Sequence, residues 1–326
     1  MKANNCGHEW IISLTQQEEE SDLDASLVQI IGDLLEVENF AIYINKHFSA
    51  QLPPTLINTH THTRLEVLES NEALALLNKV TQNKIRVSRA LGVVTTYVPV
   101  YYFGKVIGIL LIETTKELAQ TTTMLAVHIL NIYANQLGLL HKSRLDPLTE
   151  LLNRQTFDKK VIEIVSGKGF LLPRDDTNEK RRWYLAIADI DHFKRVNDSY
   201  GHVIGDEVIL LVARLLKNNF RLEDYVFRYG GEEFAVLFQT KTEAQAHIAL
   251  NRLRSNIAEY PFPQVGQLTI SIGFLELASI DTVSSIVNQA DMALYHSKNS
   301  GRNKVTAYSE LEVNEEVTTD NSIELF

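Results

Sequence analysis

The amino-acid sequence predicts an α+β protein with two domains joined by a long helix. The chain has 326 residues, of which 45% are hydrophobic and 22% charged, so it can build two separate cores. Its first half contains two β-rich runs flanked by helical patterns, and its second half alternates strand and helix patterns. Between them lies a run without proline whose apolar residues have helical spacing.

The first half is predicted to form a small sheet with helices, preceded by an N-terminal tail over residues 1–20. Leu23, Leu27 and Leu34 recur at helical spacing and predict an amphipathic helix. Gly104 separates the two β-rich runs and predicts a hairpin. The elements expected here are the helices Ser21–Val37 and Asn71–Val80 and the strands Asn39–Ile44, Val93–Tyr102 and Val106–Glu113.

A long helix is predicted from Glu117 to about Lys142, where Gly138 is the only glycine. Its apolar residues follow a 4-3-4-3 spacing that is typical of a coiled-coil seam: Ala126, Leu130, Tyr133, Leu137 and Leu140. Two interpretations remain open at this point. The seam either covers the N-terminal sheet or contacts a second copy of the chain, and it is shorter than the roughly three or four heptads that would favour the second.

The second half is predicted to be a central, mostly antiparallel sheet flanked by helices. The predicted order β-α-α-β-β-α-β-α is typical of an α+β sheet. The elements expected are the strands Trp183–Asp189, Tyr225–Tyr229, Glu233–Gln239 and Leu268–Phe274 and the helices Asp191–Ser199, Val203–Phe220, Glu243–Glu259 and Val283–Lys298. Residues 310–326 carry several acids and no Lys or Arg, and we expect a disordered acidic tail there.

Charge and cysteine content exclude several classes of protein. The net charge of −10 argues against nonspecific nucleic-acid binding. The single cysteine, Cys6, excludes an internal disulfide framework and a cysteine-based zinc cluster. The N-terminus lacks the long apolar segment of a signal peptide, and the longest dense apolar run, Val106–Ile112, is too short to cross a bilayer. We therefore expect a cytoplasmic location without membrane insertion.

Two acidic motifs carry the chemistry of the second half. Asp189 ends a buried apolar strand, where a carboxylate is costly unless a cation compensates its charge. Asp191 follows two residues later and has the alternative of a helix N-cap. Phe193 and Lys194 open the next helix, whose free N–H groups and added cation suit a phosphate. Asn197, one turn on, offers both a donor and an acceptor to a base edge.

The second acidic motif is a hairpin between two strands. Gly230 and Gly231 predict a tight turn that lets a nucleotide approach the backbone. Glu232 stands at this turn. On neighbouring strands, Asp189 and Glu232 would form the two-carboxylate metal site of nucleotidyl transfer. The alternative for an isolated Gly-Gly-Glu-Glu is a plain hairpin with solvated acids.

With these motifs in order, the chain resembles the GGDEF diguanylate cyclases over residues 143–309, with Gly230–Phe234 as a GGEEF variant of the signature. The other matching segments are Asp146–Thr149 with Leu151–Arg154, Asp189–Lys194 with Asn197-Asp198, Gly201-His202 with Gly205-Asp206, Ser271–Gly273, and Tyr295, Lys298 and Gly301–Asn303. Glu150 departs from the family, which usually has glycine at that place. A changed turn geometry outside the presumed active site is expected there.

The resemblance implies synthesis of cyclic di-GMP from two GTP, and it implies a role for each motif residue. Asp189 and Glu232, with the backbone carbonyl of Ile190, would hold Mg²⁺ (or Mn²⁺), and Glu232 would assist deprotonation of the attacking 3′-hydroxyl. Phe193, Lys194, Lys298 and Arg302 would contact the phosphates, and Asn197 and Asp206 would read the guanine, with Gly230 and Gly231 also against the substrate. These residues also have structural alternatives to a role in substrate binding. Lys298 and Arg302 could be ordinary cations at the C-terminal end of a helix, and Asp206 could be a helix N-cap.

The resemblance also implies a homodimer and product inhibition. The chain carries one set of motifs, and the reaction needs two GTP-bound half-sites facing each other. Arg221 and Asp224 match the family's RxxD inhibitory site for cyclic di-GMP at its usual distance before Gly230.

Residues 21–142 resemble a GAF sensor domain in pattern, with a possible small-molecule ligand that the sequence does not identify. His60 and His62 lie on one side of an extended run, but no third metal ligand is evident, so a solvated loop is the simpler interpretation. Two alternatives to a cyclase remain: a catalytically silent cyclic di-GMP receptor that binds through Arg221 and Asp224, and a ligand-sensing dimerisation protein. The chain after Tyr308 is too short for a phosphodiesterase domain.

Overall fold

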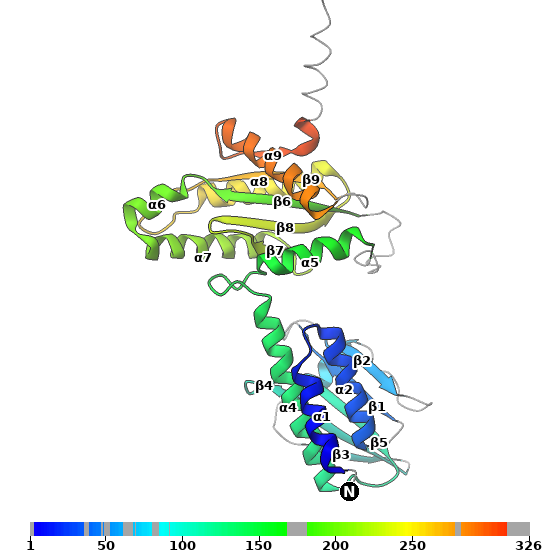
Figure 1. The fold of residues 1–326 in the computed structure, drawn as a ribbon. Helices are drawn as coiled ribbons and strands as arrows, with labels where there is room; N and C mark the ends of the chain where they lie inside the picture. Colours follow the sequence, from blue (N-terminus) through cyan, green and yellow to red (C-terminus); the bar gives the residue numbers. More distant parts are fainter. Residues whose placement is uncertain are drawn as a thin grey trace, which may run out of the picture. The chain divides into compact units, whose positions relative to one another are not determined.

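A computed structural model shows two compact units, which we describe separately (Figure 1). The contact pattern divides the chain after Ser143, one residue from the predicted boundary. The structure describes residues 3–35, 39–46, 48, 53–60, 68, 70–79, 85–90, 92–167, 181–277 and 282–311. The predicted acidic tail lies outside these residues from position 312 on.

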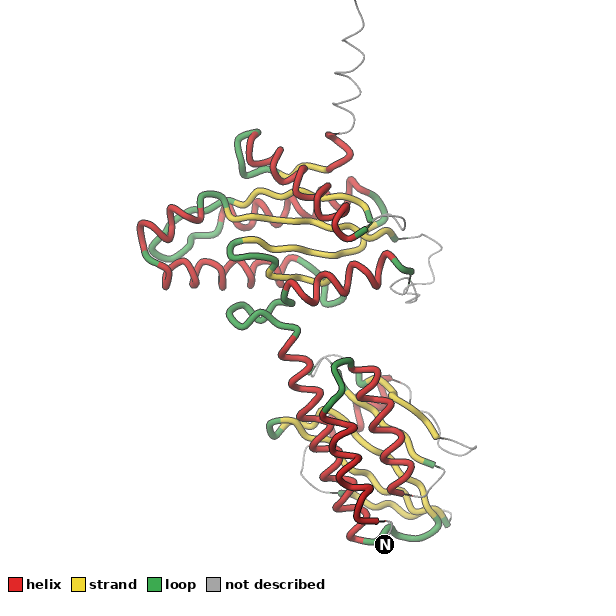
Figure 2. Tube along the Cα trace, in the orientation of Figure 1, coloured by secondary structure: helices red, strands yellow, loops and turns green. Residues whose placement is uncertain are grey.

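The N-terminal unit is an antiparallel sheet with helices on both faces (Figure 2). The strand order is β2-β1-β5-β4-β3. Helices α1, α2 and α4 pack on one face, and α3 packs on the other. The elements are α1 (Ala3–Thr15), α2 (Glu20–Leu35), β1 (Phe40–Ile44), β2 (Thr55–His60), α3 (Ser70–Lys79), β3 (Arg86–Ala90), β4 (Val93–Tyr102), β5 (Lys105–Thr114) and α4 (Gln120–Ser143).

The structure corrects the prediction of an N-terminal tail over residues 1–20. Residues Ala3–Thr15 form helix α1, which packs against α2 and α4. Leu14 is fully buried, and Trp10, four residues earlier, packs against the same core. This short apolar face is what the sequence prediction missed. Strands β2 and β3 were also not predicted, and every residue of β3 is exposed, so β3 has no alternation of buried and exposed positions to detect.

The seam of the long helix lies in the core of the N-terminal unit. Ala126, Leu130, Tyr133 and Leu137 are fully buried, and Leu140 is almost so. They pack with α1, α2 and the sheet, which confirms the sheet-covering interpretation and leaves this seam unavailable to a second copy. Within the described residues, α4 is the one helix long and apolar enough to span a bilayer.

Glycine 138 lets α4 approach the sheet closely. A Cβ atom at Gly138 would lie 2.1 Å from the ring of Tyr102 on β4, a distance that real side chains do not adopt. Deeper in the same core, the hydroxyl of Tyr133 donates to the buried carboxylate of Asp24 at 2.7 Å. Lys46 pairs with the same carboxylate. The exit helix is thus fixed by both a close approach and a charged hydrogen bond.

The C-terminal unit is a mixed sheet with helices on both faces (Figure 1). The strand order is β10-β9-β6-β8-β7, in which β10 and β9 are parallel and the other pairs antiparallel. Helix α5 and strand β10 were not predicted. The elements are α5 (Arg154–Val165), β6 (Arg182–Ile190), α6 (Phe193–Tyr200), α7 (His202–Asn219), β7 (Tyr225–Arg228), β8 (Glu233–Thr240), α8 (Glu243–Glu259), β9 (Ile270–Glu276), α9 (Val283–Asn299) and β10 (Val305–Ala307).

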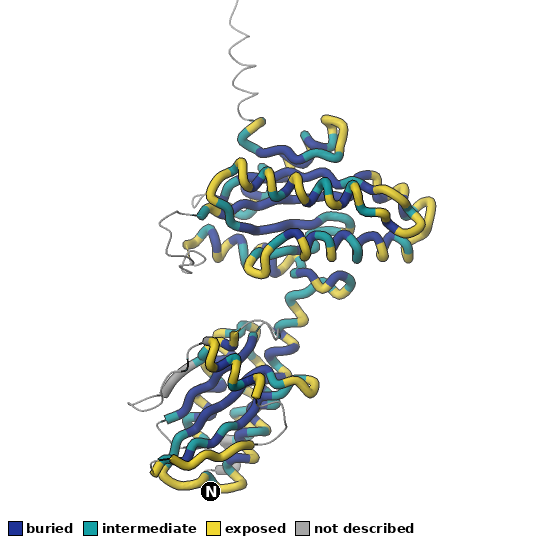
Figure 3. Tube along the Cα trace, turned by 180° about the vertical axis from the view of Figure 1, so that it is seen from behind, coloured by how far each residue is buried: buried dark blue, intermediate teal, exposed yellow. Residues whose placement is uncertain are grey.

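The central strand β6 is buried on both faces, as Figure 3 shows for the middle of the sheet. Ala186 and Ala188 face a core formed with α6, α7 and α8, while Leu185 and Ile187 face a core formed with α5 and α9. Gly273 on β9 allows α9 to lie directly on the sheet, because a Cβ atom there would be 2.1 Å from the backbone nitrogen of Leu294. This close approach brings the C-terminal end of α9 to the end of β6.

The turn at Glu150 has a backbone conformation that glycine adopts more easily than other residues. Glu150 has φ of +54°, in the left-handed region that costs an L-residue about 1–2 kcal/mol. Its side chain is exposed, and its carbonyl accepts a hydrogen bond from Lys217 Nζ at 3.1 Å. The turn therefore keeps the geometry that glycine would give it, at a cost in stability.

We predict that Glu150→Gly raises the free energy of unfolding of the C-terminal unit by about 0.5–1 kcal/mol, because relief of the left-handed strain exceeds the added entropy of the unfolded chain. Urea denaturation followed by Trp183 fluorescence in a Trp10→Phe background measures it. The matched control, Glu150→Ala, removes the same side chain but keeps the strain. Equal unfolding energies for the two variants would contradict the argument.

Candidate active site

Asp189 occupies the end of the central strand, between two neighbours. It is opposite Glu233 on β8 and Ser271 on β9, and its exposed fraction is only 7%. Burial raises the pKa of the Asp189 carboxyl above its ordinary value, although Lys298 opposes the rise. Lys298 Nζ lies 2.8 Å from Asp189 Oδ1. Position 189 therefore holds a desolvated carboxylate beside one cation from α9.

Glu232 lies at the hairpin beside this strand end. The backbone N–H of Ile190 donates to the carbonyl of Glu232 at 3.4 Å, which links the end of β6 to the turn. Burial raises the pKa of Glu232, and the charge of Asp189 raises it further. The pKa of Glu233 is raised by burial first and then by the charges of Asp189 and Asp291. Three carboxyls thus repel one another at one edge of the sheet.

This arrangement fits a magnesium-type ion. Hard cations prefer oxygen ligands, and Mg²⁺ is commonly held by one or two carboxylates together with substrate phosphates. Asp189 and Glu232 would supply the carboxylates, and Ile190 a carbonyl at the same strand end. Among the described residues there is no group of three or more His, Cys, Asp or Glu side chains suited to a metal, so waters and phosphate oxygens would complete the coordination.

The hairpin is held by an arginine that the sequence reasoning missed. Arg228 donates to both oxygens of Asp146, at 3.1 and 3.2 Å, and to the carbonyl of Gly231, at 2.9 Å. Asp146 also accepts from the backbone and hydroxyl of Thr149. These hydrogen bonds and the ion pair with Arg228 lower the pKa of Asp146 even though burial opposes the change. One guanidinium therefore ties the turn before α5 to the acidic hairpin.

The two glycines of the hairpin have different surroundings. A Cβ atom on Gly230 would lie 2.4 Å from the carboxylate of Glu233, so only glycine fits without a shift. Gly231 faces open space. The backbone N–H groups of Tyr229 and Gly230 both donate to the carbonyl of Glu233 and close the turn. An open backbone beside Glu232 is suited to close approach of a ligand.

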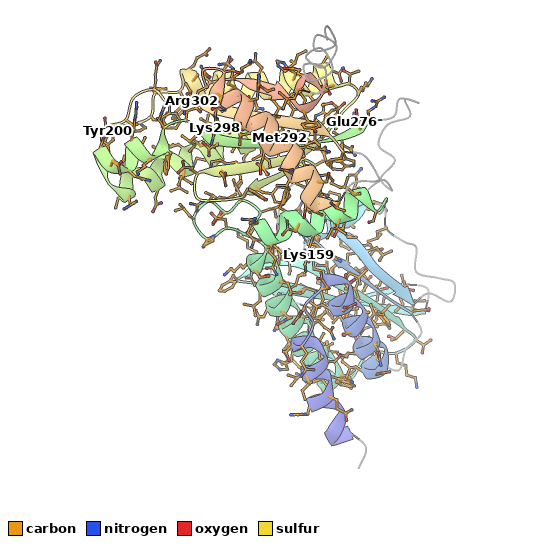
Figure 4. The ribbon with its side chains drawn as sticks, turned by 45° about the horizontal axis from the view of Figure 1, so that its top comes forward. Lys159, Tyr200, Glu276, Met292, Lys298 and Arg302 are labelled. Atoms are coloured by element: carbon orange, nitrogen blue, oxygen red, sulfur yellow. The ribbon has the colours of Figure 1, made fainter. Side chains whose placement is uncertain are left out.

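The cations that act on Asp189 come from the end of α9 and the loop after it, and a further predicted phosphate ligand, Lys194, lies on α6. Lys194 is exposed in the first turn of α6, whereas the side chain of Phe193 is buried, which leaves only its backbone for a ligand. Lys298 and Arg302 lie near the C-terminal end of α9, where Figure 4 labels them. Arg302 has φ of +62°. Lys298 is paired with Asp189, so a bound phosphate would compete with that ion pair.

The residues predicted to read a base lie on α6 and α7. The amide oxygen of Asn197 sits 2.0 Å from where a Cβ atom of Gly205 would be, so Gly205 makes room for the Asn197 side chain. Asp206 is exposed on α7 and does not cap it, because the N-cap is Gly201. The side chain of Asn197 is therefore positioned by its contact with Gly205. The alternative that Asp206 is the N-cap of α7 is wrong.

Arg221 and Asp224 line a separate pocket of about 410 Å³. The carboxylate of Asp224 accepts from the backbone N–H of Arg221 at 2.8 Å, and burial raises the pKa of Asp224. The pocket also contains Arg252, which no motif revealed. Arg252 donates to the side chain and the carbonyl of Asn219, at 3.0 and 2.8 Å. Arg181 and Lys241 also line this polar pocket, so it has three arginines, one lysine and one carboxylate.

The structure leaves one sequence hypothesis untested and decides part of another. His62 lies outside the described residues, and only the backbone of His60, in β2, is described. The N-cap alternative for Asp191 is wrong, because the N-cap of α6 is His192. Asp191 is instead a buried acceptor for three donors from later parts of the chain. Its partners are 78 to 112 residues away, so local sequence carried no signal for them.

We predict that, as the pH is lowered, this site loses its affinity for a metal ion at a higher pH than a site made of two exposed carboxylates would. The raised pKa values of Asp189 and Glu232 mean that protons displace the metal earlier as the pH falls. Mn²⁺ binding, followed by electron paramagnetic resonance over a pH series, measures the shift. Glu232→Gln should weaken binding and reduce its pH dependence, whereas Glu259→Gln, at an exposed position on α8, should change neither. Wild-type affinity that is constant until exposed carboxylates titrate would contradict the prediction.

Comparison with known proteins agrees with this geometry. Residues 143–304 match the family model described as "Diguanylate cyclase, GGDEF domain". The chain is 35% identical to diguanylate cyclase DgcP of Pseudomonas aeruginosa over 50% of this chain and 24% of that protein. It is 32% identical to diguanylate cyclase A of Treponema denticola over 64% of this chain and 58% of that protein.

Among solved structures, the GGDEF domain of DgcB from Caulobacter crescentus in complex with c-di-GMP is 33% identical, with a TM-score of 0.45, over 51% of this chain and 96% of that one. The chain spans only about a quarter to three fifths of the curated relatives named above. The match to the family covers the sheet end, the hairpin and the cations described here. Residues 143–304 are a GGDEF domain, and through this domain the chain belongs to the diguanylate cyclase family.

Proposed function

We propose that this protein condenses two molecules of GTP into cyclic di-GMP with release of two pyrophosphates. The observation that carries the proposal is the pair of desolvated carboxylates, Asp189 and Glu232, beside Lys298 at one end of the sheet. Such a pair is suited to a divalent cation, which would neutralise charge at the reacting phosphate when bound. The membership of residues 143–304 in the GGDEF family supports the same reaction.

The substrate would lie between the acidic hairpin and helix α6. Lys194, Lys298 and Arg302 would contact the terminal phosphates, together with the free N–H groups at the start of α6. Asn197 and Asp206 would bind the guanine. A carboxylate accepts well from the N1–H and N2–H₂ donors of guanine, and adenine offers no such pair, so Asp206 favours GTP over ATP.

Each step of the reaction is a phosphoryl transfer between two substrates. The 3′-hydroxyl of one GTP attacks the α-phosphate of the other, a P–O bond to pyrophosphate breaks, and the hydroxyl proton is released. Repetition in the opposite direction closes the ring. Glu232, whose pKa is raised by burial and by Asp189, is suited to accept that proton. The remaining groups act by positioning and by charge neutralisation.

The active form would be a homodimer. One chain carries one set of carboxylates and cations, which is enough for one GTP. Two facing C-terminal domains would bring the two substrates together. The seam of α4 is buried within its own unit, so contact between two copies would need other surfaces.

The pocket of Arg221 and Asp224 would bind the product and inhibit the enzyme. Two guanidinium groups, from Arg221 and Arg252, are suited to the two phosphates of a cyclic dinucleotide, and Asp224 is suited to guanine donors. Asn219 holds Arg252 in place before any ligand arrives.

The N-terminal unit would be a GAF-like sensor that regulates the cyclase. An antiparallel sheet with helices on both faces, and an exit helix anchored in its core, supports this role. Its ligand would be a small molecule of a class that the described residues do not reveal.

We predict that the purified protein makes cyclic di-GMP and pyrophosphate from GTP and Mg²⁺. Glu232→Gln should lower the rate about a hundredfold or more, because it removes a metal ligand and the proton acceptor. Glu259→Gln changes the charge equally at an exposed site and should keep the rate. Chromatographic assay of both products measures it. Binding of cyclic di-GMP without product, in a dimeric sample stripped of bound nucleotide, would instead favour the receptor function.

Product inhibition gives a second prediction. Arg221→Ala and Arg252→Ala should each raise the half-inhibitory concentration of cyclic di-GMP roughly tenfold, because each removes a charged hydrogen-bond donor from the pocket. The half-inhibitory concentration is measured against each variant's own uninhibited rate. Arg214→Ala, which removes an exposed arginine of α7 outside the pocket, should leave this concentration unchanged. Inhibition that is equally strong in all variants would exclude the pocket as the inhibitory site.

A further inference from the structure

Asp191 is the most deeply buried acid at the active-site edge, and the catalytic scheme above does not use it. Its exposed fraction is 3%. Its Oδ1 accepts from Ser271 Oγ at 2.7 Å, and its Oδ2 accepts from Thr269 Oγ1 at 2.7 Å and from the backbone N–H of Asn303 at 3.0 Å. Three of the roughly four acceptor sites of this carboxylate are therefore occupied by donors from the protein itself.

The loop that Asp191 holds has an unfavourable backbone. Gly301, Arg302 and Asn303 have φ of +103°, +62° and +43°, and two of the three are not glycine. Such left-handed conformations are unfavourable for residues other than glycine and persist only where surrounding contacts impose them. The loop after α9 therefore depends on the groups that bind its backbone.

Few contacts impose this conformation. The N–H of Arg302 donates to the carbonyl of Ser297 at 3.1 Å, and Arg254 donates to Asn303 Oδ1 at 2.7 Å. Just after the loop, the carbonyl of Lys304 accepts from Ile272 at 2.8 Å. The bond from Asn303 to Asp191 is the one that uses a buried, ionisable acceptor, and hydrogen bonds to such groups are the stronger kind.

Arg302 is the residue whose direction this loop sets. It lies between Gly301 and the anchored Asn303, near the end of α9 that carries Lys298 (Figure 4). Arg302 and Lys298 both lie close enough to Asp189 for their charges to act on its carboxyl, and a change in the left-handed turn would move Arg302 from this position. Lys298 and Arg302 can bind the same phosphate only if both side chains stay in these positions.

We propose that Asp191 is a positioning residue for the terminal phosphates of the nucleotide: by accepting the N–H of Asn303, it fixes the left-handed turn that holds Arg302 beside Lys298. The proposal rests on the proposed function, which supplies the nucleotide. It assigns Asp191 to recognition of the triphosphate and gives it no part in metal binding or guanine recognition.

The test compares binding of a triphosphate and a monophosphate that cannot react. The ligands 3′-deoxy-GTP and 3′-deoxy-GMP lack the attacking hydroxyl, and calorimetry with Mg²⁺ gives their dissociation constants. Asp191→Asn keeps the size of the side chain but loses its charge and part of its acceptor capacity. It should weaken 3′-deoxy-GTP binding roughly tenfold and change 3′-deoxy-GMP binding less than about twofold. Glu259→Gln is the charge-matched control.

A double-mutant cycle identifies the route of the effect. If Asp191 acts through Arg302, Asp191→Asn combined with Arg302→Ala should bind 3′-deoxy-GTP no more weakly than Arg302→Ala alone. Additive losses, or equal weakening of both nucleotides, would overturn the proposal. If Asp191→Asn does not fold, Arg254→Ala removes the partly exposed contact to Asn303 and should cause a smaller loss that is again selective for the triphosphate. Unchanged selectivity in Arg254→Ala would overturn the proposal in that case.

The same data separate this proposal from the proposed function. Wild type that binds 3′-deoxy-GTP no more tightly than 3′-deoxy-GMP would contradict the phosphate site itself. Wild type that prefers the triphosphate, with Asp191→Asn retaining that preference, would contradict only the role given to Asp191.

Discussion

Burial of the Asp189 carboxylate at the end of β6 constrains everything around it. The strand is central, with partners on both sides, so the charge cannot reach bulk water by a small movement. Lys298 balances it from a helix that Gly273 lets lie directly on the sheet. Glu232 is added from the hairpin and increases the repulsion. The excess negative charge at this edge is the feature on which the proposed binding of a divalent cation and phosphates depends.

Sequence reasoning reached most of the C-terminal domain because its motifs and periodic elements coincide. The predicted bounds of strand β6 differ from the observed ones by one residue at each end, and those of helix α8 are the same as observed. Strand β6 is a nearly continuous apolar run, which predicts a strand buried on both faces. Helix α1 and strand β3 were missed for opposite reasons: α1 has a short apolar face after a polar start, and β3 is exposed throughout. In the site, Arg252 and the role of Arg228 were missed because their partners come from distant segments.

The N-terminal unit shows how an ambiguous pattern is resolved by packing. The spacing of Leu130, Tyr133 and Leu137 suits a coiled coil and a sheet-covering helix equally. The structure decides for the second, because Tyr133 reaches the buried Asp24 and Gly138 lets the helix contact Tyr102. Heptad spacing alone does not contain this information, since it describes one face of a helix and not what lies against it.

The contacts of Asp191 also bear on how the domain is assembled during synthesis. Its donors are 78, 80 and 112 positions later in the chain, so a growing chain carries the acid long before it carries the groups that bind it. Until β9 has paired and residue 303 has emerged, a buried charge has no partners, and the strand that bears it cannot settle in its final environment. The native surroundings of Asp191 are therefore complete only after the segment that contains residue 303 has been synthesised.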